Sequence, residues 1–297
     1  MRSLSFAATL LGAVALTGCA ATHRPSGLQV VAAESFWGSI AAQIAGNRAT
    51  VQSIVSNPAV DPHGYEPTSS DARRTAVAKV AIVNGLGYDR WASQLLAADP
   101  SGERVVVDTG KVLGLSDGDN PHQWYSPASV RRVTDAIAVA LTRADPKDAA
   151  YFAERKRAFE SRSLARYDAL RAEIRRRFAG VPVGYSESIF EPLGASLGLN
   201  LLTPPSFAKA VAEGGEVSAA DKQTVEGQLL HRKLAVWVFN SQNVTPEIDQ
   251  LNALARRAQI PVVTVTETLS PATATFQGWQ AAQLESLLSA LHRATGR

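Results

Sequence analysis

Cysteine is nearly absent from this sequence, which contains a single one, Cys19, among 297 residues. A disulfide within the chain is therefore excluded, and an iron–sulfur or copper(I) site is disfavoured because such sites use several thiolates. Histidine is also scarce, with five in the chain, and none lies in the HExxH pattern of many zinc hydrolases. The N-terminal apolar run is shorter than the roughly 20 residues that a membrane-spanning helix needs.

The small positive net charge of +3 does not indicate nucleic-acid binding. Much of the basic charge lies in residues 154–178, where arginine and lysine alternate with apolar residues at helical spacing. This pattern is typical of a helix with one solvated face.

Residues 1–18 have the composition of a secretory signal. Arg2 precedes an apolar run, and the run ends in LTGC at residues 16–19. This arrangement resembles a bacterial lipoprotein signal, which implies cleavage before Cys19, lipid on its sulfur, and a tether over residues 19–27. We therefore expect a protein outside the cytoplasm, in the periplasm or at the cell surface, and anchored to the membrane by lipid. An ordinary signal peptide with an incidental cysteine is the alternative.

From Leu28 onward, runs rich in valine and isoleucine alternate with helical patterns. Such alternation predicts an α/β fold with parallel sheets, and the nearly continuous apolar strands predict burial on both faces. A helical pattern from about Pro146 to Phe178 interrupts this rhythm and is long enough to connect two lobes. The sequence therefore predicts two α/β lobes, residues 28–145 and 180–297, joined by one long rigid helix over residues 146–179.

Four side chains that can bind a metal follow predicted strands. His63 in DPHGYEPT and His122 in NPHQWYSP belong to the first predicted lobe, and Glu187 and Glu267 end strands of the second. In parallel sheets, ligands bind beyond the carboxyl ends of the strands, so these four residues could converge in a cleft between the lobes. Two imidazoles and two carboxylates suit zinc or manganese.

Other residues near these positions could support a metal site. Asp61, Glu66 and Asn120 could accept hydrogen bonds from the imidazoles and orient them. His231 and His292 lie at helix ends, where a structural role is favoured. The alternative is a protein that binds an organic solute and in which the histidines are merely packed.

Several spaced motifs resemble the TroA-like zinc and manganese solute-binding proteins of bacterial ABC transporters. They run from about Leu28 to the C-terminus and are SNPAVDPHGYEPTSSD, NGLGYDRW, NPHQWYSP, EGGEVSAAD, VFNSQNVTPEIDQL, IPVVTVTETLSP and TFQGWQAAQL. The resemblance implies two lobes, one connecting helix, and one divalent metal in the cleft. By position it implies His63, His122 and Glu267 as ligands. Members of this family usually supply a further His or Glu ligand from the stretch that corresponds to LLTPPSFAKA, which here contains no His, Glu or Asp. The remaining ligand position is therefore taken by Glu187, which we favour, or by water.

The resemblance implies a receptor that captures zinc, our first expectation, or manganese and delivers it to a membrane permease. We expect a monomer with no enzymatic activity and no nucleic-acid partner. The alternatives are a zinc metallohydrolase and a surface adhesin or metal-storage lipoprotein.

Overall fold

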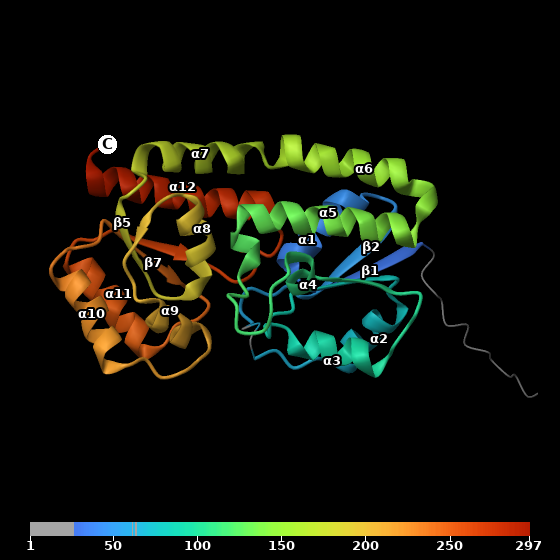
Figure 1. The fold of residues 1–297 in the computed structure, drawn as a ribbon, viewed down its shortest axis with the longest axis horizontal. Coiled ribbons are helices and arrows are strands. Elements are labelled where there is room, and N and C mark those ends of the chain that lie inside the picture. The colour runs from blue at the N-terminus through green and yellow to red at the C-terminus, as the bar shows by residue number, and fades with distance from the viewer. Residues whose placement is uncertain (1–26, 61, 63) are drawn as a thin grey trace, which may run out of the picture.

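Two four-stranded parallel sheets form the framework of the protein, in a computed structural model that describes residues 27–60, 62 and 64–297 (Figure 1). The strand orders are β2-β1-β3-β4 and β6-β5-β7-β8. The predicted α/β fold with two parallel-sheet lobes is thereby confirmed. The strands are β1 (Leu28–Glu34), β2 (Ala49–Val55), β3 (Val80–Val83), β4 (Val105–Asp108), β5 (Pro182–Tyr185), β6 (Asn200–Leu201), β7 (Val236–Asn240) and β8 (Val262–Val265).

The central strands of each sheet are largely apolar, and helices cover both faces of the sheet and bury these strands. All four residues of β3 and all five of β7 are buried, as expected for strands that are covered on both faces. The N-terminal lobe uses α1 (Ser35–Ala45), α2 (Ser69–Val77), α3 (Arg90–Ala98), α4 (Thr109–Leu113) and α5 (Pro127–Ala144). The C-terminal lobe uses α8 (Glu191–Ser196), α9 (Pro205–Ala212), α10 (Ala219–Leu230) and α11 (Pro246–Arg257).

The long helix predicted between the lobes is present, but it is interrupted by one wider turn. It consists of α6 (Ala149–Ala158), a π-helical turn η3 (Phe159–Ser163) and α7 (Ala165–Phe178). The N–H of Leu164 donates to the carbonyl oxygen of Phe159 at 3.0 Å, five residues back. Phe159 and Leu164 are both buried, and a π turn places residues five apart on one face. The wider turn thus keeps the apolar stripes of α6 and α7 on the same side.

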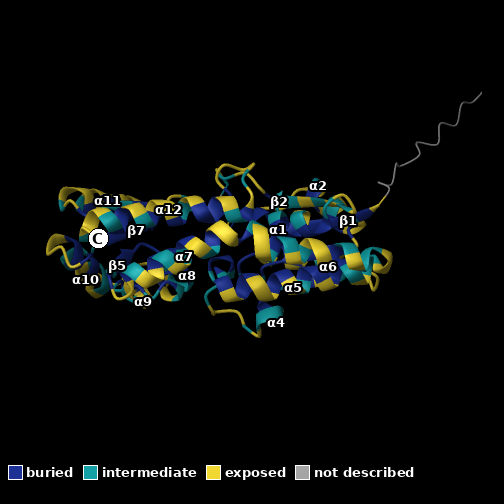
Figure 2. Cartoon of the chain, turned by 90° about the horizontal axis from the view of Figure 1, so that it is seen from above, coloured by how far each residue is buried: buried dark blue, intermediate teal, exposed yellow. Residues whose placement is uncertain are grey.

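A second helix, α12 (Phe276–Thr295), also runs from one lobe to the other. Its first residue donates a backbone hydrogen bond to Ser39 Oγ at 2.9 Å on α1, and the helix then lies along α7 toward the C-terminal lobe (Figure 1). Exposed and buried residues alternate along α6, α7 and α12, as expected for rods that lie on a surface (Figure 2). Within the described residues, no helix combines the length and the apolarity needed to cross a bilayer.

The carboxyl ends of the two sheets face each other. The Tyr88 hydroxyl, beyond β3, donates to Glu267 Oε2 beyond β8 at 3.0 Å. Asn120, beyond β4, donates to the carbonyl oxygen of Ser188 beyond β5 at 2.8 Å. Residues that follow strands in either lobe therefore meet in one interlobe region.

Candidate metal centre

His122 is fully buried between the lobes, in the loop that precedes α5. The Asn120 Oδ1 atom accepts from the backbone N–H of His122 at 3.0 Å and lies 2.9 Å from the imidazole Nδ1. Since an amide oxygen can only accept, Nδ1 carries a proton in this pair, which leaves Nε2 as the ring atom that could bind a metal. The acceptor predicted at Asn120 thus orients the imidazole.

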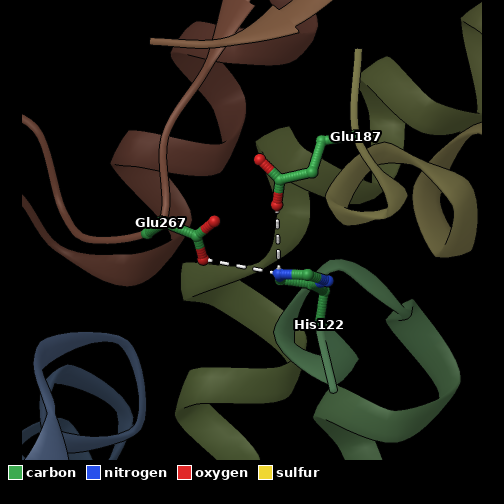
Figure 3. A group of neighbouring side chains, drawn as sticks. All are labelled: His122, Glu187 and Glu267. Atoms are coloured by element: carbon green, nitrogen blue, oxygen red, sulfur yellow. Dashed lines mark ion pairs between the residues drawn. The ribbon is translucent and has the colours of Figure 1, made fainter. Parts of the chain in front are cut away.

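Glu187 and Glu267 point toward this nitrogen from the C-terminal lobe (Figure 3). The Oε1 atom of Glu187 lies 3.5 Å from His122 Nε2, and the Oε2 atom of Glu267 lies 3.6 Å from it. One ligating atom from each residue falls within 4.8 Å of the other two, and both carboxylates are 1% exposed. Three of the four predicted ligands are therefore brought together, and they come from both lobes.

Asn240, the last residue of β7, holds the two carboxylates in place. Its Nδ2 donates to Glu187 Oε2 at 2.8 Å and to Glu267 Oε1 at 2.7 Å. Asn243 donates to Glu187 as well, at 3.2 Å. We did not single out Asn240 from the sequence, although it ends a strand, because amides were not counted among the metal-capable side chains.

The charges of this site fit a divalent cation. Burial raises the pKa of Glu187 well above its usual value, and the nearby Glu267 carboxylate raises it further. Among the residues that the structure describes, no lysine or arginine forms an ion pair with Glu187. Two buried carboxyl groups close together are costly to ionise, and a bound divalent metal would offset their charge.

The other residues singled out from the sequence either lie outside the described part of the chain or lie away from this cluster. His63, Asp61 and Cys19 lie outside the described residues. Glu66 is exposed, and so is His231, which ends α10. His292 packs its ring against Phe178 at the far end of α12, with the two centroids 5.1 Å apart. The stretch LLTPPSFAKA runs from the end of β6 into α9 and contributes no residue to the cluster.

A cleft of about 640 Å³ adjoins the centre. Both lobes line it, with Tyr88 and Asn120 on one side and Ser188, Glu191 and Lys209 on the other. The three converging side chains themselves are buried and do not open directly to solvent.

Two further buried carboxyl groups with raised pKa values, Glu34 and Asp89, lie in the N-terminal lobe, and neither is predicted as a site residue from the sequence. Glu34 ends β1, and Asp89 precedes α3 and accepts hydrogen bonds from the backbone N–H groups of Asn84 and Gly85, each at 2.7 Å. Burial raises the pKa of Glu34 well above its usual value, with the Asp89 charge adding to the effect. Burial also raises the pKa of Asp89 to about 6. Applying the strand-end rule to β1 would have identified Glu34.

These raised pKa values predict that the metal-free protein loses stability as pH rises. The folded pKa values exceed those of the unfolded chain, so the contribution of Asp89 is complete below about pH 4 and disappears as pH passes through about 6. Glu34 and Glu187 act in the same direction. For Asp89 we expect a loss of roughly 2–3 kcal/mol between about pH 4 and pH 7, measured by denaturant unfolding in the presence of a chelator. The Glu34→Gln variant should show a smaller loss; an unchanged slope would contradict this assignment.

Comparisons with known proteins identify the family of the chain. The family model described as "ZnuA: Zinc-uptake complex component A periplasmic" matches residues 30–290. A curated relative, the "Manganese-binding lipoprotein MntA" of Halalkalibacterium halodurans, is 34% identical over 136 residues, which are 45% of this chain and 45% of that protein. The chain thus spans about half the length of this relative. The "Metal ABC transporter substrate-binding lipoprotein FimA" of Streptococcus parasanguinis is 24% identical over 86% of this chain and 85% of its own.

Solved structures share the fold. A manganese-bound periplasmic metal binding protein from Candidatus Liberibacter asiaticus superposes with a TM-score of 0.72 at 20% identity, covering 89% of this chain and 99% of that one. The two-lobe architecture is therefore one that is already known from experiment.

Proposed function

The chain belongs to the family of the periplasmic zinc-uptake component A, and on this basis we propose that it is an extracytoplasmic receptor for a divalent transition metal. One observation carries the proposal. His122 from the N-terminal lobe and Glu187 and Glu267 from the C-terminal lobe converge within 4.8 Å and are buried. Buried titratable groups that converge from separate elements indicate a binding site rather than a surface cluster.

Capture and release both follow from the fact that each lobe supplies ligands. A cation that enters between the lobes is bound by groups of both, so binding favours the closed arrangement. A small separation of the lobes would move His122 away from the two carboxylates, so that the cation could no longer keep all three ligands. We propose that a membrane permease binds the opened form and so receives the cation, while α7 and α12 limit the movement.

The metal that we propose is zinc or manganese. An imidazole suits both metals, and two carboxylates make the site harder, which helps manganese to compete. By the general order of divalent affinities, zinc should bind more tightly than manganese in vitro. His63 remains our proposal for a further ligand. Attachment of the protein to the membrane through lipid on Cys19 is likewise proposed, in keeping with the lipoprotein names of the relatives.

Calorimetric titration of the purified, metal-stripped protein with Zn²⁺ and with Mn²⁺ tests this function. We expect one tight site for each ion, with protons released on zinc binding because Glu187 binds a proton more readily than an ordinary carboxyl. Absence of a tight site would contradict the receptor and favour an organic solute. Turnover of ester substrates by the zinc-loaded protein would instead favour a metallohydrolase.

A further inference from the structure

Asn120 connects the two lobes at the metal centre. While its Oδ1 orients His122, its Nδ2 donates to the carbonyl oxygen of Ser188 at 2.8 Å and to Glu191 Oε2 at 3.1 Å. Ser188 directly follows Glu187. One amide therefore ties the loop of an N-terminal ligand to the residue beside a C-terminal ligand.

Gln242 makes the corresponding connection from the C-terminal lobe. Its Oε1 accepts from the backbone N–H of Thr268 at 2.9 Å, and its Nε2 donates to Thr268 Oγ1 at 2.9 Å. The same Nε2 also donates to the carbonyl oxygen of Pro58, in the N-terminal lobe. Thr268 directly follows Glu267, and Pro58 lies on the loop that leads toward residue 63. A second amide thus joins the two lobes beside the second carboxylate.

We propose that Asn120 and Gln242 are latch residues that set the rate at which the bound cation is released. The inference rests on the proposed function. Opening of the lobes must break the hydrogen bonds from Asn120 Nδ2 to Ser188 and from Gln242 Nε2 to Pro58, whichever metal is bound. Water replaces these partners once the lobes separate, so each latch contributes modestly. The two residues therefore adjust the release rate, whereas the ligands decide whether the cation binds at all.

The test uses variants that remove the interlobe bonds but no ligand. In Asn120→Ser, the hydroxyl can still accept from the backbone N–H of His122 but is too short to reach Ser188; it also gives up the acceptor of His122 Nδ1, so Gln242→Met is the decisive variant. In Gln242→Met, the length of the side chain is kept, and the bond to Pro58 is lost together with the bonds to Thr268. Mn²⁺-loaded protein is mixed with excess chelator in a stopped-flow instrument, and release is followed by tryptophan fluorescence, since the Trp124 and His122 ring centroids are 5.2 Å apart.

Each variant should release Mn²⁺ about five- to tenfold faster, with little change in the association rate, and the double variant should show roughly the product. Gln228→Met is the matched control, because Gln228 Nε2 donates to the carbonyl oxygen of Leu202 at 2.7 Å within one lobe. It should lower stability and leave release unchanged.

Three results would overturn the latch. If the wild type binds Mn²⁺ tightly and Gln242→Met releases it at the wild-type rate, the latch hypothesis is wrong and the receptor hypothesis still holds. Equal acceleration by Gln228→Met would show a general loss of stability instead. A wild-type protein that binds no Mn²⁺ or Zn²⁺ would remove both the latch and the receptor.

Discussion

Replacing His122 by alanine is expected to weaken Zn²⁺ and Mn²⁺ binding by about a thousandfold or more, which corresponds to about 4 kcal/mol. Among the described residues, His122 is the one ligand that we propose from the N-terminal lobe, and its Nε2 lies within 3.6 Å of an oxygen of each carboxylate. Without it, the cation loses a strong nitrogen donor and one of the groups that make binding favour the closed lobes. Competition titration against a chelator of known affinity measures the loss.

His231→Ala is the matched control for this change, because His231 is exposed at the end of α10 and lies outside the cluster. It should bind both ions as the wild type does. If the two alanine variants lose affinity equally, or if His122→Ala binds normally while folded, the proposed centre is wrong.

Replacing Glu187 by glutamine is expected to lower the metal affinity and to raise the stability of the metal-free protein. Metal affinity should fall by about a hundredfold to a thousandfold, since the amide keeps the shape but loses the charge that the cation needs. The metal-free protein should become more stable at neutral pH, because a buried carboxyl with a raised pKa, beside Glu267, is no longer forced to ionise. Thermal unfolding with and without Zn²⁺ should therefore show a higher starting Tm and a smaller shift on adding metal.

Glu34→Gln separates these two effects. Glu34 is also a buried carboxyl with a raised pKa, but it lies outside the metal cluster. This control should stabilise the metal-free protein and leave the affinity near that of the wild type. Tight metal binding by Glu187→Gln would give its place in the coordination shell to water or to another residue, and would contradict our assignment of Glu187.

The helices and strands of the two lobes could be predicted because the apolar pattern of each segment and the residues at its ends indicate the same element. The valine-rich strands β1, β3 and β7 are buried on both faces, and the turns and helices between them carry ordinary start and stop residues. Ser126 illustrates this point, since it caps α5 by accepting from the N–H of Ser129 at 3.3 Å, directly before Pro127. Position after a strand also predicts His63, His122, Glu187 and Glu267 as metal-binding side chains, and the last three converge among the described residues.

The sequence by itself thus determined the α/β class, two parallel sheets, a long connecting helix and the side chains able to bind a metal, because those features depend on periodicity and on position after a strand. Only the tertiary structure decided that α12 is a second connection, that one amide of Asn240 serves both carboxylates, and that Asn120 and Gln242 join the lobes. Gln242 and Pro58 are 184 residues apart in the chain, and no local pattern encodes their contact. Such pairings depend on how the packed lobes meet, and that arrangement follows from the burial of side chains along the whole chain.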